Sequence, residues 1–191
     1  MLKITEHGME GTPPDRLGVV QSKPVIGQLA LKFTRWQRAI NAERFMDGGD
    51  IHLDIGCGDG YFLMRSPYRV RYGFDPLMGK EDLIEDRIEF PDAHFDLVTM
   101  LAVIEHLPNV REMLEEIFRV LKPGGKLILT TPKKSAEWFI SLYLNNVHEI
   151  HETYFDLVSM REICHGLFTI TGYRTFILGL NQAFCLVKNS D

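Results

Sequence analysis

The segment Leu53–Gly60 reads LDIGCGDG and combines three glycines with two acidic residues. The run Ile51–Ile55 before the glycines predicts a buried strand, and Tyr61–Met64 after them predicts the start of a helix. Glycine lets the chain turn tightly and lets a ligand lie against bare main chain. A strand, a glycine turn and a helix start in this order are typical of a nucleotide-binding site. The alternative is a purely structural glycine turn.

The residues around the glycines indicate which nucleotide would bind. A dinucleotide fingerprint has a third glycine where this chain has Tyr61. A pyrophosphate also prefers a helix start without carboxylates, whereas this loop carries Asp54 and Asp59. Two carboxylates suit a ligand with a positive end, such as S-adenosylmethionine, which has a sulfonium and an amine.

A second acidic residue follows the next predicted strand, Val70–Phe74. Asp75 lies fifteen residues after Gly60, close to the spacing of a ribose-binding acid in a strand–helix–strand unit. Its carboxylate could accept two charge-assisted hydrogen bonds from ribose hydroxyls. The alternative for Asp75 is a turn or helix-cap residue before Pro76.

These motifs and three later ones resemble the class I S-adenosylmethionine-dependent methyltransferases, from about residue 51 to 132. Leu53–Gly60 resembles the first motif of that family and Gly73–Asp75 the second. The later similarities are Phe90–Val98, Val103–Pro108 and Arg119–Gly125, the last followed by a strand to Pro132. The resemblance implies an enzyme of class EC 2.1.1. Its methyl group would pass to an oxygen, nitrogen or carbon nucleophile of a small molecule by direct in-line displacement.

The fold implied is an α/β three-layer Rossmann-like sandwich. Its mostly parallel sheet would have seven strands, with strand three possibly reduced and an antiparallel strand at the C-terminus. Alternating strands and helices independently favour a parallel sheet with helices on both faces. The expected strands are 51–55, 70–74, 95–101 and 126–131, then 175–178 and 183–187. The expected helices are 28–46, 60–66, 109–121 and 156–168.

One domain is expected for residues 1–191. Residues 1–24 are expected to be loose, 25–47 to form an N-terminal helix, 50–132 the cofactor-binding core, and 133–191 the substrate side and last strands. Within the first helix, Leu29, Phe33, Trp36 and Ile40 fall at helical spacing and predict an amphipathic helix.

The resemblance also implies which residues hold the cofactor. They are Asp54, Gly56, Cys57, Gly58, Asp75, Pro76, Asp82 and Leu101. In this alignment Asp82 meets the adenine amino group, in a shortened third-strand region within residues 81–90. Asp86 is the competing choice, and a solvated acidic face is the alternative for both. Cys57 is expected to pack rather than react.

Glu105 and His106 follow the predicted strand 95–101 and are the candidate catalytic residues. His106 could take a proton from the nucleophile, or pack beside the cofactor, or cap a helix; Glu105 is its partner or rival. Some quinone-pathway relatives have a further Glu where this chain has Ala102, which disfavours a metal-assisted mechanism. His148 and His151 lack the spacing that places two imidazoles on one helical face, so no metal is expected.

Bulk composition narrows the partners and the compartment. The net charge is −5 without a Lys/Arg cluster, so neither RNA nor DNA is expected and the predicted partner is a small methyl acceptor. Three cysteines without metal spacing favour a reducing, cytoplasmic compartment. No apolar run reaches the roughly 18 residues of a membrane span. Two other functions remain open: a non-catalytic cofactor-binding or partner module, and an NAD(P)-dependent oxidoreductase.

Overall fold

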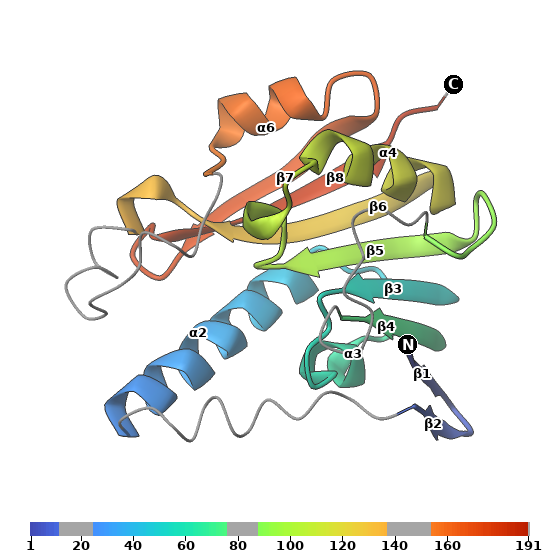
Figure 1. Cartoon of the computed structure of the whole chain (residues 1–191), viewed down its shortest axis with the longest axis horizontal. Helices are drawn as coiled ribbons and strands as arrows, with labels where there is room; N and C mark the ends of the chain where they lie inside the picture. The colour runs from blue at the N-terminus through green and yellow to red at the C-terminus, as the bar shows by residue number, and fades with distance from the viewer. Residues whose placement is uncertain (12–24, 76–87, 137–153, 191) are drawn as a thin grey trace.

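The computed structural model describes residues 1–11, 25–75, 88–136 and 154–190 and contains one eight-stranded sheet (Figure 1). The strands in chain order are β1 (Leu2–Thr5), β2 (Gly8–Glu10), β3 (Ile51–Ile55), β4 (Val70–Phe74), β5 (Phe95–Leu101), β6 (Leu121–Pro132), β7 (Phe168–Phe176) and β8 (Asn181–Lys188). Their order across the sheet is β2-β1-β4-β3-β5-β6-β8-β7.

The four central strands are parallel, as the alternation of strands and helices predicts. β3 pairs in parallel with both β4 and β5, and β5 pairs in parallel with β6. At one side of this block β8 pairs antiparallel with β6, and β7 pairs antiparallel with β8. The predicted α/β fold with an antiparallel C-terminal end is therefore confirmed. Parallel strands place their carboxyl ends at one edge of the sheet, which is where ligands bind in such folds.

The N-terminal residues correct one prediction. Residues 1–24 were expected to be loose, but β1 and β2 form a hairpin, and β1 pairs antiparallel with β4. The hairpin is held because Leu2 and Ile4 are buried with Cys57 and Leu63. β1 therefore holds the place beside β4 where a third strand from residues 81–90 was expected. Most of that stretch lies outside the described residues, and Ile88–Phe90 is not a strand.

Helices cover both faces of the sheet. They are α2 (Val25–Glu43), α3 (Tyr61–Arg65), α4 (Val110–Val120) and α6 (Leu157–Ile163), with a 3-10 turn, η2 (Ile104–His106). Neighbouring residues of β6 show the two faces, because Leu127 and Leu129 pack in the core with α4 and α6, while Ile128 packs with α2 and α3 residues. This alternation is the two-residue period of a strand covered on both sides.

The N-terminal half of α2 departs from its predicted packing. Leu29, Phe33 and Trp36 are 61%, 50% and 43% exposed, whereas Ala39 and Ala42 further along the helix are buried. Figure 1 shows the reason, since the first turns of α2 extend past the sheet and only its last turns cover it. The helical prediction is confirmed, but the apolar stripe in its first half does not face the core.

The C-terminal elements also differ in detail. The helix expected at 156–168 ends at Ile163, and β7 begins at Phe168. Asp156 is the N-cap and accepts hydrogen bonds from the amides of Val158 and Ser159. Asp156 and Ser159 thus form a capping box that satisfies the first amides of α6.

Candidate functional site

The glycine loop connects β3 to α3 at the carboxyl edge of the sheet. The amides of Gly56 and Cys57 both donate to the carbonyl of Phe74, at 2.7 and 3.1 Å, which binds the loop to the end of β4. Gly56 has a φ of 77°, and a Cβ placed on it would lie 2.2 Å from Val103 Cγ2. This position therefore requires glycine both for its backbone angle and for the close approach of the chain after β5.

Asp75 lies directly at the end of β4 and is 1% exposed. Its Oδ2 accepts a 2.7 Å hydrogen bond from the amide of Gly58. The two predicted cofactor motifs, far apart in sequence, therefore meet at one point. A buried carboxylate beside bare main chain is compatible with binding the ribose hydroxyls of a nucleoside.

Asp54 lies beneath the loop in a chain of buried side chains that the sequence did not reveal. Thr99 Oγ1 donates to Asp54 Oδ1 at 2.6 Å, His52 Nε2 lies 2.8 Å from Thr99 Oγ1, and His52 Nδ1 lies 2.9 Å from Ser66 Oγ. Because Thr99 donates its one proton to Asp54, His52 must donate through Nε2 and accept from Ser66 at Nδ1.

Burial shifts the pKa values of Asp54 and His52, the two ionisable side chains in this hydrogen-bonded network. Loss of solvent raises the pKa of Asp54 to about 7; the Thr99 bond opposes this and the charge of Asp75 adds to it. Loss of solvent, with the charge of Arg71, lowers the pKa of His52 to about 3. His52 is therefore neutral at physiological pH, and Asp54 gains its charge near it.

Asp59 does not share the predicted role of Asp54. Its Oδ2 accepts a 2.7 Å hydrogen bond from Arg35 Nη1 of α2, and its Oδ1 accepts from the amide of Tyr61 at 3.1 Å. The Arg35 guanidinium also lies 4.1 Å from the centre of the Tyr61 ring. The Asp59 carboxylate therefore pairs with Arg35 and links α2 to the glycine loop.

Leu101 is half-buried and packs against the same core cluster as Tyr61.

The structure separates the two candidate catalytic residues. Both lie in η2, just beyond the carboxyl end of β5, but Glu105 is buried and His106 is exposed. Loss of solvent raises the pKa of Glu105 above its usual range, although Arg38, His106 and Thr131 oppose the rise. Loss of solvent also lowers the pKa of Arg38, against the charge of Glu105. Arg38 is thus a charged neighbour of the site that the sequence analysis missed.

Other predicted residues lie outside the part of the chain that the structure describes. Among the cofactor residues these are Pro76 and Asp82, with the competing Asp86; His148 and His151 lie outside it as well. Within the described residues, no group of three or more His, Cys, Asp or Glu side chains could hold a metal ion.

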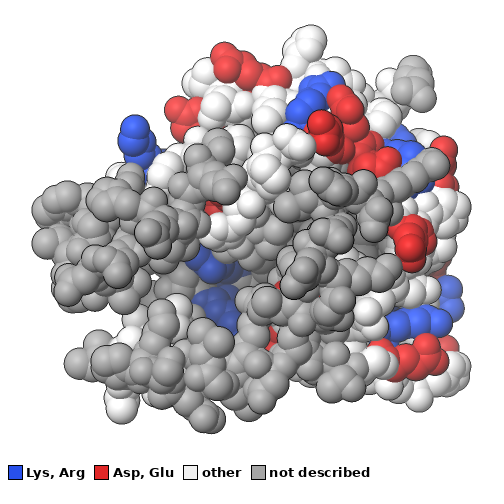
Figure 2. All heavy atoms as spheres, viewed as in Figure 1, with Lys and Arg blue, Asp and Glu red and all other residues white. Residues whose placement is uncertain are grey.

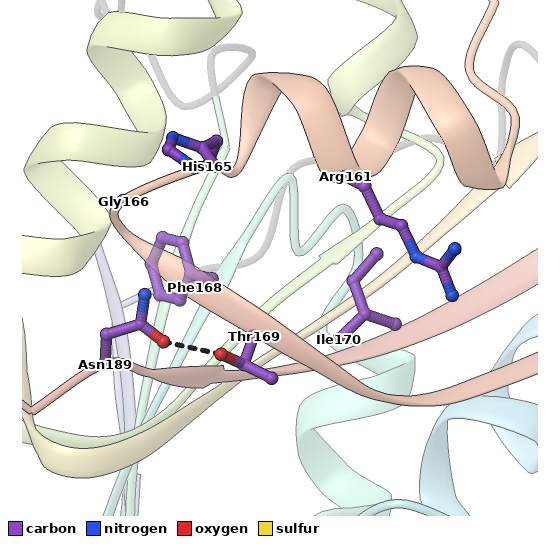
Figure 3. A pocket seen from close by; sticks show the side chains of 7 residues that line it. All are labelled: Arg161, His165, Gly166, Phe168, Thr169, Ile170 and Asn189. Atoms are coloured by element: carbon purple, nitrogen blue, oxygen red, sulfur yellow. Dashed lines mark hydrogen bonds between the residues drawn. The ribbon is translucent and has the colours of Figure 1, made fainter.

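A surface pocket of about 440 Å³ lies at α6, β7 and the end of β8 (Figure 3). Phe168 pairs with Lys188, while Lys126 at the amino-terminal side of β6 pairs with Val187. The pocket is therefore at the opposite sheet edge from the glycine loop. Thr169 Oγ1 also donates across it to Asn189 Oδ1 at 2.7 Å, so we assign it no part in the chemistry.

Comparison with known proteins shows the family. A family model described as a methyltransferase domain matches residues 31–167. The chain therefore belongs to the class I S-adenosylmethionine-dependent methyltransferases, as its motifs predict, and S-adenosylmethionine is the cofactor of this class. This family match favours the methyltransferase over the alternative of an NAD(P)-dependent oxidoreductase.

Individual relatives differ in what they methylate. The tRNA (carboxymethyluridine(34)-5-O)-methyltransferase of Arabidopsis thaliana is 30% identical over 113 residues, covering 52% of this chain and 28% of that protein. The demethylmenaquinone methyltransferase of Symbiobacterium thermophilum is 28% identical over 133 residues, covering 57% of this chain and 53% of that protein. The chain thus matches about half or less of these relatives' own length.

A solved structure shows the same fold. It is a chain in the complex between the Trm112 methyltransferase activator of Haloferax volcanii and a methyltransferase, with a TM-score of 0.68 and 18% identity. The alignment covers 85% of this chain and 92% of that one.

The relatives overturn the predicted partners. Nucleic acid was not expected because the chain lacks a Lys/Arg cluster, yet relatives are named for tRNA and a structural neighbour comes from a complex with an activator protein. That expectation is wrong because overall charge is a weak guide here: the tRNA-named Arabidopsis relative matches this chain over only 28% of its own length. As for membranes, no helix in the described residues is long and apolar enough to cross one.

Proposed function

We propose that the chain transfers a methyl group from S-adenosylmethionine to an oxygen, nitrogen or carbon nucleophile by direct in-line displacement. The observation that carries this proposal is the junction of Gly58 and Asp75, where a glycine amide and a buried carboxylate meet at the tips of β3 and β4. In the proposed complex, Asp75 binds the ribose hydroxyls and Gly56–Gly58 lies against the amino-acid portion of the cofactor.

The cofactor supplies a methyl group already activated by a sulfonium, so the chain's own contribution is mainly orientation. Holding two reactants in line is worth up to about 7–11 kcal/mol in favourable cases. Leu101 and the loop after β5 would close the cofactor side, and the acceptor would enter past η2 at the ends of β5 and β6. In this proposal Glu105 and His106, which lie in η2, are the groups that would take a proton from a protonated nucleophile.

Calorimetric titration with S-adenosylhomocysteine and with NAD tests the binding half of the proposal. We expect micromolar affinity for the first and no heat from the second. Binding of NAD, or of neither ligand, would contradict the proposal.

A transfer assay tests the chemical half. The protein is incubated with methyl-labelled S-adenosylmethionine and two fractions of a cell extract, one of tRNA and one of small molecules. Label in either fraction supports transfer and assigns the acceptor class. Binding of S-adenosylhomocysteine without label in any fraction would favour the non-catalytic binding module instead.

A further inference from the structure

Four buried polar side chains form a continuous row of hydrogen bonds behind the glycine loop. The row runs from Asp54 through Thr99 and His52 to Ser66, and we call these four residues the Asp54 network. All four are buried. The inference below rests on the proposed cofactor binding and concerns what Thr99 and His52 do for Asp54.

The pairing of β3 with β5 builds the network. Asp54 and Thr99 are direct partners in the parallel register of the two strands. His52 lies two residues before Asp54 and therefore on the same face of β3. Ser66 is the C-cap of α3, and its amide donates to the carbonyl of Leu63. The network therefore connects the strand below the glycine loop with the end of the helix that follows the loop.

The hydrogen bonds of the network have one direction. Thr99 donates its only hydroxyl proton to Asp54 Oδ1 at 2.6 Å, so its oxygen accepts from His52 Nε2. His52 Nδ1 accepts from Ser66 in turn. No described residue donates a hydrogen bond to Asp54 Oδ2. When the carboxyl group is neutral, its proton therefore belongs on Oδ2, because Oδ1 is already an acceptor.

The neighbouring charge that acts on Asp54 is negative. It belongs to Asp75 at the end of β4, and it raises the pKa of Asp54. Thr99 opposes that rise because its hydrogen bond favours the ionised carboxylate. Arg71 of β4 acts instead on His52, whose pKa it lowers. Within the described residues, Asp54 thus has a donor in Thr99 but a like charge in Asp75.

The basic side chains around the loop have acidic neighbours of their own. They are Arg35 with Asp59, Arg38 with Glu105, and Arg65 with Glu43. Figure 2 shows basic side chains in a hollow on this face, beside α2. A cation supplied by the ligand would therefore be a favourable partner for Asp54.

Asp54 is the member of the network that changes charge near physiological pH. Burial raises its pKa to about 7 and lowers that of His52 to about 3. His52 is therefore neutral throughout the range in which Asp54 titrates. A ligand ammonium beside Asp54 favours the ionised carboxylate, so binding such a ligand releases the Asp54 proton to the solvent. By linkage, the affinity for that ligand falls as pH decreases.

We propose that Thr99, oriented by His52, is a positioning residue that presents the Asp54 carboxylate to the ammonium of the cofactor, so that cofactor binding expels a proton from Asp54. Thr99 holds Oδ1, and the proton and the ammonium compete for Oδ2. His52 acts through Thr99, because its Nε2–H occupies the Thr99 oxygen and leaves the Thr99 proton for Asp54. In a purely structural network, cofactor affinity would not depend on the protonation of Asp54.

Calorimetry of the native chain counts the expelled proton. S-adenosylhomocysteine is titrated at pH 6 in two buffers that differ in their enthalpy of ionisation. We expect about one proton released per ligand bound, and an affinity about tenfold weaker at pH 5.5 than at pH 7. Binding without proton release, at an affinity that pH does not change, would overturn the inference and leave the proposed function intact. Absence of binding at every pH would contradict both proposals.

Thr99→Val and Thr99→Ser form a matched pair, because the first removes the donor to Asp54 and the second keeps it. In Thr99→Val the pH at which affinity is half lost should rise, and affinity at pH 7 should fall about fivefold or more. Thr99→Ser should keep the native pH profile. An equal midpoint in Thr99→Val and the native chain would overturn the role of Thr99, whatever happens to stability.

Two further variants test the other members of the network. Asp54→Asn should bind S-adenosylhomocysteine more weakly and without releasing a proton, and a normal proton count would overturn the assignment of the proton to Asp54. His52→Phe removes the donor to Thr99 and should move the midpoint in the same direction as Thr99→Val. An unchanged midpoint would overturn the role of His52. The proton count of the native chain decides the inference even where a variant does not fold.

Discussion

The two ends of the carboxyl edge are built differently. At the cofactor end, comprising Asp54, Gly56–Gly58 and Asp75, described side chains and amides bond to one another. At the end beyond β5, Glu105 is buried beside Arg38 and Thr131, and loss of solvent raises the pKa of its carboxyl. The comparison teaches that short hydrogen bonds fix the glycine-loop end, whereas burial and charge dominate around η2.

The largest expected effect comes from Gly56 at the cofactor end. Gly56→Ala adds a Cβ at a φ of 77° and 2.2 Å from Val103 Cγ2. Backbone strain and overpacking together should reduce the free energy of unfolding by about 2–4 kcal/mol. Urea denaturation measures this loss, and Gly124→Ala is the matched control, since it has a φ of 71° and an open space around its Cβ. Equal losses in both variants would remove the close approach from the explanation.

Asp75→Ala tests the cofactor end by binding. Removing a carboxylate that bonds the ribose should weaken S-adenosylhomocysteine affinity tenfold or more, about 1.4 kcal/mol. Calorimetry measures the loss. The control Asp50→Ala changes an exposed carboxylate at the opposite end of β3 and should bind S-adenosylhomocysteine normally. Unchanged affinity in Asp75→Ala would exclude Asp75 from the cofactor site.

The buried hydrogen-bonded network of Asp54, Thr99 and His52 predicts an unusual pH dependence of stability. Folding raises the pKa of Asp54 to about 7, so its contribution to stability falls as pH rises from about 4 to 7. Folding lowers the pKa of His52 to about 3, so its contribution falls as pH drops from about 6.5 to 3. Between about pH 4 and 6.5 the two slopes oppose each other.

Asp54→Asn removes the loss of stability with rising pH that Asp54 causes, and it leaves the opposite pH dependence that His52 causes. The free energy of unfolding of this variant should therefore rise more steeply with pH from 4.5 to 6.5 than that of the native chain, by up to about 1.4 kcal/mol per pH unit. Denaturation series at fixed ionic strength measure both curves. Parallel curves would mean that Asp54 titrates normally, contrary to its burial.

The smallest effect is expected at the contact between α2 and the loop. Arg35 and Asp59 are 47% and 38% exposed, so Arg35→Ala should cost about 1 kcal/mol or less, including the contact with Tyr61. Urea denaturation at low and high salt measures the loss, which should shrink with salt. A loss of several kcal/mol that salt does not change would show that Arg35 is a core packing residue.

Sequence reasoning could predict the glycine loop and Asp75, which the structure brings together, because their signals are local. The glycines and Asp75 belong to short motifs with fixed spacing. The motifs in residues 51–75 can therefore be recognised from the local sequence alone. The surroundings of Glu105 depend on tertiary contacts, since Arg38, Glu105 and Thr131 come from α2, η2 and β6. Single polar residues at such positions have no periodic or motif signal, so Arg38 was not predicted.

The same distinction explains the errors in the fold. The parallel strands were predicted from continuous apolar runs. The N-terminal hairpin was missed because β1 and β2 are four and three residues long, and their stability comes from pairing with β4 and from burial of Leu2 and Ile4. The stripe of Leu29, Phe33 and Trp36 predicted a helix correctly, but a helical period alone does not show how far the sheet extends beneath it.

A crystal structure of the chain with S-adenosylhomocysteine tests the central claim most directly. The predicted result is a ribose hydrogen-bonded to the Asp75 carboxylate, with the amino-acid end of the ligand against the main chain of Gly56–Gly58. A ligand bound elsewhere, with the glycine loop empty or filled by the protein's own side chains, would contradict it.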